Sequence, residues 1–472
     1  MKANYILAAL VSMLPVFQAC HEKPEENVEI ELKQCLTPAQ LAYDITGMDV
    51  AFSWTVAKDA ESYNLVIASD PACVTVVESV AVAPEDVPYA VELAEGEYYF
   101  KVQAIAGGKD PSNWAIYDGM VKVEDNAPAI DLSAAATANC YVVNTAGKYK
   151  FRSNKANTST AIEGITDVVI LWETSTEDET ATLAPNSVIA KVSYKDGYIE
   201  FATPKTFKPG NALIAARNIT MGTDETTGEA VEKIRILWSW HIWLTSEPIA
   251  DVTVGDIVLM DRNLGELSAS ARTSMLYQWG RKDPFPGSYG NAKKVAVAGE
   301  QTTARGSSIK SYAENPTVLS GRILTDGADF IHKDLADLDL WGTGDDKTEQ
   351  DPCPAGYKVP HAGTDTSNDI SKTPFAALSG LTFNSGVFTL GSASFSQTGC
   401  YLLNTISPSV GSADLLIEEN TCYLWTASRN AKRQGGCIRI SEGSAAYWIK
   451  NKDAEAPYQA KNNAFAVRCQ KM

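Results

Sequence analysis

The sequence predicts a multidomain protein in which two all-β units are followed by a third unit of the α+β class. At roughly 150 residues per domain, the 472 residues leave room for about three domains. Short runs of alternating apolar and polar residues, separated by turn signals, fill residues 35–124 and 129–250, as is typical of antiparallel strands. Residues 251–472 contain frequent glycines and irregular stretches, and a short helix is expected over residues 270–279.

The chain is acidic, with 40 Lys and Arg against 58 Asp and Glu and a net charge of -18. A nucleic-acid-binding surface needs an excess of basic side chains to neutralise phosphates. The charge balance therefore argues against nucleic acid as a partner, and also against a basic patch resting on an anionic membrane. With 45% hydrophobic and 21% charged residues, the composition is that of a folded globular protein.

Residues 1–19 have the pattern of an export signal, because Lys2 precedes an apolar stretch that is too short to span a bilayer. The segment ends at Cys20, directly after a small residue, and it resembles the signal of bacterial lipoproteins, in which this cysteine is lipidated. An ordinary secretory signal with a chance cysteine is the alternative.

Residues 20–34 are expected to form an extended, acidic tether that cannot bury apolar surface. In lipoproteins of Bacteroidetes-type bacteria, an acidic stretch after the cysteine resembles the signal for display on the outer face. The resemblance implies an outer-membrane protein, held in lipid by the acylated Cys20 and exposed on the extracellular side.

The first β unit, residues 35–124, resembles a fibronectin type III domain. The resemblance rests on Trp54 in a Phe-Ser-Trp strand, on Tyr63, and on Tyr98 and Phe100 in a later strand. It implies a β-sandwich in which these aromatic side chains belong to the core. The usual role of such a domain is spacing or protein contact.

The second β-sandwich-like unit, residues 129–250, closes with the aromatic-rich run 234–243. Strand alternation predicts that one face of this run is apolar and faces the core. That face consists of Ile236, Trp238, Trp240 and Ile242. A glycan-stacking platform is the alternative for the two tryptophans. His241, on the other face, is expected to be a hydrogen-bonded structural histidine.

Several motifs in the C-terminal half recur together in one family. They occupy residues 238–243, 260–265, 277–285, 351–360, 423–428 and 464–469. Their order and spacing resemble the Fibrobacter succinogenes major paralogous domain, which is common on surface lipoproteins and fimbrial tip proteins of Bacteroidetes. The resemblance covers roughly residues 240–472 and implies a relative of the C-type lectin fold over residues 251–472.

The resemblance to the C-type lectin fold also implies one long disulfide bond, which would pair Cys353 with Cys469. Cys422 and Cys437 are a second candidate pair. The Glu-Pro-Asn and Gln-Pro-Asp triplets that hold calcium in sugar-binding C-type lectins are missing from this sequence, which disfavours calcium-dependent sugar binding by that route. The sequence has no Cys-x-x-Cys pair and only four histidines, so neither a metal nor a cofactor is expected.

The sequence contains no nucleophile elbow, zinc-protease motif or phosphate-binding loop, and no catalytic residue is predicted. An acidic cluster around Trp341 has two interpretations, a solvated loop or a cation or sugar contact beside the ring. The cluster consists of Asp334, Asp337, Asp339, Asp345 and Asp346. Trp341, Asp339 and Asp345 are the ligand-binding candidates.

Together these patterns predict a non-catalytic surface lipoprotein, an adhesin or ligand-binding protein that presents a lectin-like domain on a β-sandwich stalk. The expected partner is a glycan, a host protein or a fimbrial subunit. One alternative is the tip subunit of a fimbrium. Paired carboxylates of a glycosidase leave no sequence motif, so a carbohydrate-active enzyme with a site between the second and third units is the alternative from another class.

Overall fold

A computed structural model describes most of the chain from residue 33 to residue 472 and divides it into two compact units, residues 1–127 and 128–472. The described ranges are 33–124, 128–175, 183–269, 274–286, 295–298, 309–320, 339–344, 346–364, 367–402, 411–413, 416–417, 420–430, 434–441, 444–449 and 461–472. The predicted signal segment 1–19 and the lipidation site Cys20 lie outside them, as does most of the predicted tether 20–34. None of the helices described has the length and apolar character needed to cross a membrane.

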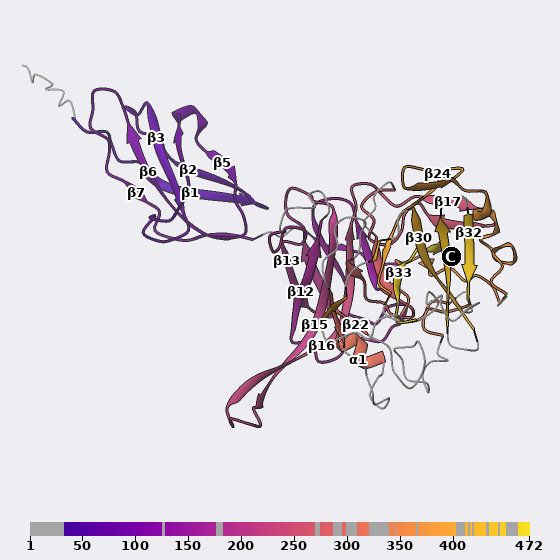
Figure 1. Ribbon diagram of the computed structural model, residues 1–472. Coiled ribbons are helices and arrows are strands. Elements are labelled where there is room, and N and C mark those ends of the chain that lie inside the picture. The colour runs from indigo at the N-terminus through magenta and orange to yellow at the C-terminus, as the bar shows by residue number, and fades with distance from the viewer. Residues whose placement is uncertain are drawn as a thin grey trace, which may run out of the picture. The chain divides into compact units, whose positions relative to one another are not determined.

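Unit 1 is an antiparallel β-sandwich (Figure 1). One sheet contains β1 (Ala39–Thr46), β2 (Asp49–Thr55) and β5 (Tyr89–Glu92) in that order. The other contains β4 (Val76–Val82), β3 (Ser62–Ala68), β6 (Gly96–Ile105) and β7 (Ala115–Ile116), with β8 (Val121–Val123) also paired to β6 and a 3₁₀ turn, η1 (Pro84–Asp86), before β5. The strand order is that of a fibronectin type III-like sandwich.

The aromatic residues that predicted this sandwich lie in its core. Trp54 and Tyr63 are buried and meet edge to face at 5.2 Å between ring centroids. Phe100 is fully buried. The Tyr98 hydroxyl donates to the Ala94 carbonyl at 2.9 Å, a tyrosine-corner contact near the start of β6 that fixes the turn before the strand.

Unit 2 begins with two four-stranded sheets that share one core. The first contains β10 (Cys140–Val143), β16 (Ala230–Leu244), β15 (Gly210–Thr223) and β12 (Asp167–Thr174). The second contains β13 (Lys191–Lys195), β14 (Tyr198–Ala202), β11 (Lys148–Arg152) and β9 (Ile130–Asp131). Phe151 and Phe201 from the second sheet pack in one cluster with Ile214 and Trp240 from the first, so the two sheets form a sandwich.

The rest of unit 2 is also mostly β-structure. A six-stranded sheet contains β20 (Phe285–Pro286), β19 (Met275–Gln278), β33 (Ala464–Ala466), β30 (Thr421–Arg429), β31 (Gly435–Ser441) and β32 (Ser444–Trp448). A second sheet contains β17 (Asp251–Val254), β18 (Ile257–Met260), β34 (Gln470–Lys471) and β23 (Tyr357–Lys358). The small sheets are β22 (Val318–Ser320), β21 (Val295–Ala298) and β28 (Gly411–Ala413); β24 (Thr382–Asn384), β25 (Val387–Leu390) and β26 (Ala393–Ser396); and β27 (Gly399–Cys400) with β29 (Leu416–Ile417).

Helical structure is sparse in the described part of residues 251–472. It consists of α1 (Ile309–Glu314) and the 3₁₀ turns η2 (Ile370–Lys372) and η3 (Ala376–Gly380). Of the helix expected over residues 270–279, residues 275–278 form strand β19 instead, because this segment pairs with β33 and is buried on all four residues. The chain is therefore a multidomain, mostly β protein.

The second half of strand β16, residues 238–244, is buried on both faces. Trp240 packs in the sandwich core of residues 129–250, whereas Trp243 packs in a cluster with Trp279, Trp425 and other residues of the C-terminal segment. Asn139 adds a polar link, since its side-chain amide donates to the carbonyls of Glu349 and Asp351 at 2.8 and 2.9 Å. Residues 129–250 and 251–472 thus share one compact unit, and their division into two domains stays a prediction.

A β-bulge changes the phase of β16. Ala216 pairs with Trp238 but Arg217 pairs with Ile236, which leaves Leu237 without a counterpart. Cross-strand partners share a face, so Ile236 lies on the face opposite Trp238. The predicted placement of Ile236 beside Trp238 is wrong for this reason.

The structure joins Cys353 to Cys469 by a disulfide bond, with 2.02 Å between the sulfurs. This is the pairing that the lectin-like resemblance implied. The bond closes the loop over a sequence separation of 116 residues. It lies beside the pairing of β23 with β34, in which Tyr357 is opposite Lys471, and so it ties the last strand to the body of unit 2.

Cys422 and Cys437 do not pair; both are buried free thiols. Cys437 is opposite Trp425 in the ladder between β30 and β31, three residues from Cys422. Successive side chains of a strand alternate between faces, so this odd spacing places the two thiols on opposite faces of the sheet. They accordingly belong to different core clusters.

We expect the double substitution Cys353→Ser with Cys469→Ser to lower the stability of unit 2. A bond that closes a loop of this length contributes about 4–5 kcal/mol in the chain-entropy argument. Thermal unfolding followed by near-UV circular dichroism, with and without reductant, would measure the loss. The disulfide lies entirely within unit 2, so the transition of unit 1 serves as the internal control, and a unit 2 transition that reductant leaves unchanged would contradict the prediction.

Candidate functional site

A pocket of about 870 Å³ lies in unit 2, where loops of residues 129–250 meet loops of the C-terminal segment. Its lining comes from the loop 133–137 between β9 and β10, from the end of β11 and the loop after it, from residues 346–347 and 355–356, and from Met472. The volume falls within the range of small-molecule sites. Loops carried on a rigid β scaffold are where binding residues are usually found.

Four polar side chains that line the pocket make no side-chain hydrogen bond to any described residue. They are Arg152, Asn154, Ser159 and Asp346. Together they offer a cation, an amide, a hydroxyl and a carboxylate, which covers both donors and acceptors. Ala134, Ala135 and Ala136 add small apolar surface.

The walls of the pocket are held in place by contacts between the two segments. The side-chain amide of Asn157, a residue with φ of 58°, donates to the Thr348 carbonyl at 2.7 Å. Lys155 forms an ion pair with Glu349 at 3.0 Å. Lys347 donates to the Cys353 carbonyl at 2.7 Å, so the disulfide also supports this wall. The pocket is therefore pre-formed.

Of the three ligand-binding candidates around Trp341, two lie among the described residues, and both make contacts within the protein. Trp341 is fully buried, and its indole N–H donates to the Arg281 carbonyl at 3.2 Å, so its ring is not available to stack on a ligand. The Asp339 carboxylate accepts hydrogen bonds from the backbone and hydroxyl of Thr343 at 2.8 and 2.7 Å. Asp345 lies outside the described residues, whereas Asp346 lines the pocket.

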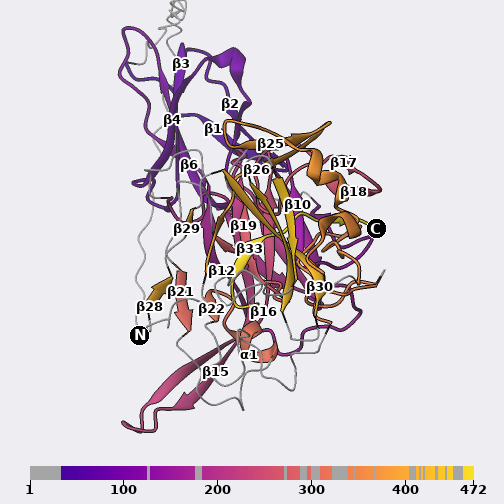
Figure 2. The ribbon, with the colours of Figure 1, turned by 45° about the vertical axis from the view of Figure 1, so that its right-hand side comes forward.

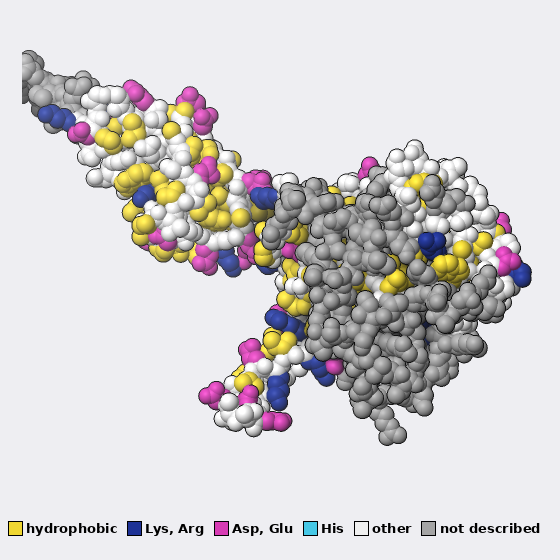
Figure 3. Space-filling model, viewed as in Figure 1, with side chains coloured by type: hydrophobic (Ala, Val, Ile, Leu, Met, Phe, Trp, Pro, Cys, Tyr) yellow, Lys and Arg dark blue, Asp and Glu magenta, His cyan; other side chains and the backbone are white. Residues whose placement is uncertain are grey.

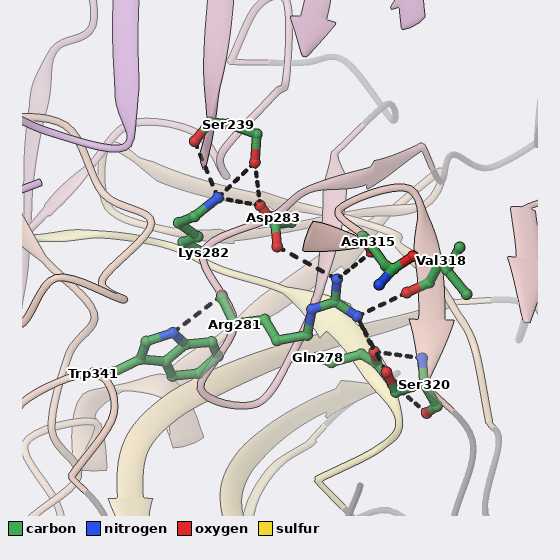
Figure 4. A network of polar contacts seen from close by, with 9 residues as sticks. All are labelled: Ser239, Gln278, Arg281, Lys282, Asp283, Asn315, Val318, Ser320 and Trp341. Atoms are coloured by element: carbon green, nitrogen blue, oxygen red, sulfur yellow. Dashed lines mark hydrogen bonds and ion pairs between the residues drawn. The ribbon is translucent and has the colours of Figure 1, made fainter. Parts of the chain in front are cut away.

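The motif around Arg281 forms a buried polar network rather than an open site (Figure 4). Lys282 donates to the Ser239 carbonyl at 3.0 Å and is ion-paired with Asp283. Ser239 donates to the same carboxylate at 2.7 Å. Arg281 reaches Asp283 at 3.3 Å and the Val318 carbonyl at 2.8 Å. Burial lowers the pKa of Lys282, and the Asp283 carboxylate opposes that shift.

His241 is buried and hydrogen-bonded at both ring nitrogens, as a structural histidine would be. Its Nε2 lies 2.8 Å from the amide oxygen of Asn211, and its Nδ1 lies 3.3 Å from the Tyr277 hydroxyl. An amide oxygen only accepts, so Nε2 carries the proton and Nδ1 accepts from Tyr277. Burial lowers the pKa of His241 to about 3, which keeps the ring neutral.

Glu266 is another group in this region with a strongly shifted pKa. Burial raises its pKa to about 7, although Arg468 and hydrogen bonds from Asn263 act in the opposite direction. The carboxylate accepts from the Asn263 backbone and side chain at 2.7 and 2.8 Å. Glu266 thereby closes the turn after β18, where Arg468 also donates to Asn263 at 2.7 Å. The contacts of Glu266 are therefore those of a structural residue.

Sequence reasoning missed the pocket residues Arg152, Asn154 and Ser159. They lie near a strand end and in a turn, where polar residues are common whatever their role. The pocket forms only when residues near 350 are brought beside them. Asp346 was within the acidic cluster that the sequence singled out.

No protein-family model matches the chain, and no curated protein matches it. Solved structures with similarity to it include a two-domain fibronectin type III segment of chicken tenascin, 12% identical, which covers 42% of this chain and 97% of that chain with a TM-score of 0.17. Another is the FN1–FN3 domains of chicken CNTN1, 11% identical, covering 51% of this chain and 78% of that chain with a TM-score of 0.15. These similarities are distant, and the description of unit 1 rests on its own strand order.

We expect Asp283→Asn to destabilise unit 2 by about 3–5 kcal/mol, because removing one partner of a buried ion pair leaves the other charge uncompensated. Equilibrium denaturation of unit 2 would measure the change. Asp167→Asn is the matched control, since the Asp167–Arg217 pair is partly exposed and such pairs contribute under about 1 kcal/mol. Equal losses in the two variants would show that Asp283 is not a buried counter-charge.

The depressed pKa of His241 predicts a pH-dependent stability term. In the unfolded chain the group titrates near its ordinary value of 6.5, and in the folded chain near 3. Its contribution is therefore fully present above about pH 6.5 and is lost as the pH falls towards 3, at roughly 1.4 kcal/mol per pH unit. His241→Gln should remove this slope.

The pH experiment compares the free energy of unfolding of the two proteins from pH 7 to pH 4. Glu266, with its raised pKa, contributes in the opposite sense, since its term is lost as the pH rises from 4.5 to about 7. Glu266 is present in both proteins, so the difference between them isolates His241. Parallel curves would mean that the imidazole is not held neutral by burial.

Proposed function

We propose that this chain is a non-catalytic cell-surface protein that binds an extracellular ligand, in the manner of an adhesin. The observation that carries the proposal is the pre-formed pocket of unit 2, with a cation, an amide, a hydroxyl and a carboxylate that make no side-chain hydrogen bond to a described residue. The cation, Arg152, also lies over the Tyr198 ring at 5.7 Å. The proposal places the ligand there, in contact with Arg152, Asn154, Ser159 and Asp346.

A polyhydroxylated ligand such as a glycan suits this lining best. Hydroxyl groups both donate and accept hydrogen bonds, so they can pair with a guanidinium, an amide and a carboxylate at once. The small apolar surface of Ala134 and its neighbours suits the C–H faces of a sugar ring. A host protein or a fimbrial subunit could present the same groups on a loop.

The proposal includes the cellular location that the N-terminal sequence implies, which is the outer face of the outer membrane, with a lipid anchor at Cys20. It also includes a C-type-lectin-like fold, of the major paralogous type, for residues 251–472. The support is the long disulfide between Cys353 and Cys469, together with the burial of motif residues such as Arg262, Trp279 and Arg468 in the core.

Two other functions stay predictions. A fimbrium tip subunit would use the same pocket or a strand-exchange contact with a neighbouring subunit. A carbohydrate-active enzyme would need two carboxylates on either side of a bound sugar. Asp346 is the carboxylate that lines the pocket among the described residues, which favours binding over hydrolysis.

We expect the chain expressed from residue 21 onward to bind a defined class of glycan or matrix protein on an array, in the presence of calcium and also of chelator. Arg152→Ala should weaken that binding by roughly tenfold or more, because a charge-assisted hydrogen bond to the ligand is lost. Titration of the array hit by calorimetry would measure the change.

Lys195→Ala is the matched control, because Lys195 is an exposed cation on β13 that does not line the pocket. Binding that survives Arg152→Ala would move recognition away from the pocket. The absence of any hit would oppose a role in glycan or matrix recognition and favour a fimbrial partner. Hydrolysis of a bound glycan would establish the enzyme instead.

A further inference from the structure

The outer halves of β15 and β16 form a two-stranded ribbon, residues 217–236, which we call the β-arm. It projects from the sheet in both ribbon views (Figures 1 and 2). Seven consecutive cross-strand pairs make it up, which corresponds to a length of about 20 Å. Among the described strands, β12 pairs with β15 only as far as Arg217 and β10 pairs with β16 only from His241. Beyond these points the edges of the β-arm have no strand partner among the described residues, although the Ile219 N–H donates to the Thr166 hydroxyl at 2.8 Å.

The β-arm is amphipathic, and its apolar face is uncovered. That face carries Ile219, Met221, Ile234 and Ile236. The opposite face carries Asn218, Thr220, Lys233 and Arg235. Met221 is 68% exposed and Ile234 is 54% exposed. Arg217 and Glu232 at the two ends of the first face and Val231 on the second depart from this alternation. The rest follows the pattern of a strand pair that packs its apolar face against another surface.

The β-arm has a defined tip. The Asp224 carboxylate accepts from the backbone N–H groups of Thr226 and Thr227 at 2.8 and 2.9 Å, and its carbonyl accepts from Gly228 at 2.9 Å. These two N–H groups also lower the pKa of Asp224. The β-arm continues two strands of a four-stranded sheet, which hold its base in place. Its exposed apolar side chains are therefore presented on a formed ribbon and are available to a second surface.

Charge is separated along the β-arm. Near its base lie Arg217, Lys233 and Arg235, of which Arg217 also pairs with Asp167 at 2.6 Å and Arg235 with Glu314 at 3.9 Å within the chain. Towards its tip lie Asp224, Glu225, Glu229 and Glu232; acidic side chains surround the tip in Figure 3. Two identical arms that run antiparallel would therefore place each acidic tip beside a basic base. The acidic tip also disfavours insertion into an anionic lipid surface.

We propose that the β-arm is a self-association surface through which two copies of this chain pair, with their arms antiparallel and their apolar faces together. A two-fold axis makes such an interface isologous, so that each copy contributes the same patch. On the apolar face itself, Glu232 of one copy approaches Arg217 of the second copy. The patch is smaller than a standard interface, so association in the micromolar range is expected.

The test is the oligomeric state of the chain from residue 21 onward, measured by sedimentation velocity over a concentration series from about 1 to 200 μM, the range in which weak interfaces associate. We expect a monomer–dimer equilibrium. Met221→Ser with Ile234→Ser should shift the midpoint to at least tenfold higher concentration, because the apolar contact is lost. Thr220→Ala with Val231→Ser, on the opposite face, is the matched control and should leave the midpoint unchanged.

A charge-swap experiment tests the antiparallel arrangement separately. Lys233→Glu with Arg235→Glu leaves Arg217 as the remaining cation and makes the arm largely acidic. Glu225→Lys with Glu229→Lys makes it largely basic. Each variant alone should be monomeric because like charges meet. An equimolar mixture of the two should restore a dimer, since each tip again meets an oppositely charged base.

Three outcomes would overturn the proposal. They are a chain that stays monomeric throughout the series, a dimer that survives Met221→Ser with Ile234→Ser, and a charge-swap mixture that remains monomeric. All substituted side chains are exposed or partly exposed, and far-UV circular dichroism would show that each variant is folded. The experiment does not depend on ligand binding in the pocket, so its result stands apart from the proposed function.

Discussion

The organisation of unit 2 depends on the burial of the second half of β16, residues 238–244, on both of its faces. Trp240 on one face packs in the sandwich core, and Trp243 on the other packs in the C-terminal core. A strand covered on both sides cannot leave polar groups unpaired without a cost of about 1–3 kcal/mol each. Ser239 and His241 lie on the second face. Because they are buried there, each is hydrogen-bonded, Ser239 to Asp283 and His241 to Asn211.

The sequence predicted this strand and the burial of one of its faces, but not the burial of the other face by the C-terminal segment. Alternation alone identified Trp238, Trp240 and Ile242 as core residues, and all three are buried in one cluster. The segment that buries Ser239 and His241 comes from elsewhere in the chain, and no local pattern encodes it. The bulge at Leu237 was not predicted for a related reason. The register of a strand depends on its partner strand as well as on its own sequence.

For the candidate site as well, the sequence predicted features that depend on neighbouring residues but not those that depend on contacts between distant segments. The acidic cluster near Trp341 was visible in the sequence, and Asp346 does line the pocket. Trp341 is in the core, where Trp279 packs against it at 5.5 Å between ring centroids. The local sequence places Trp341 in a loop but does not show whether another part of the chain buries its ring. Cys422 and Cys437 were a second candidate pair, but the odd register spacing in the β30–β31 ladder separates them.

The bulge in β16 lies at the boundary between the buried part of the strand and the β-arm. Trp238 is 3% exposed and Ile234 is 54% exposed, so the environment of the strand changes within four residues, and the arm can vary without disturbing either core. If two copies pair through their arms, each dimer carries two pockets. A second binding event on a repetitive ligand then becomes intramolecular, and effective concentration rather than new contacts raises the avidity. Weak pockets on a weakly paired protein would thus suffice for firm attachment where the ligand repeats and the protein is concentrated on a surface.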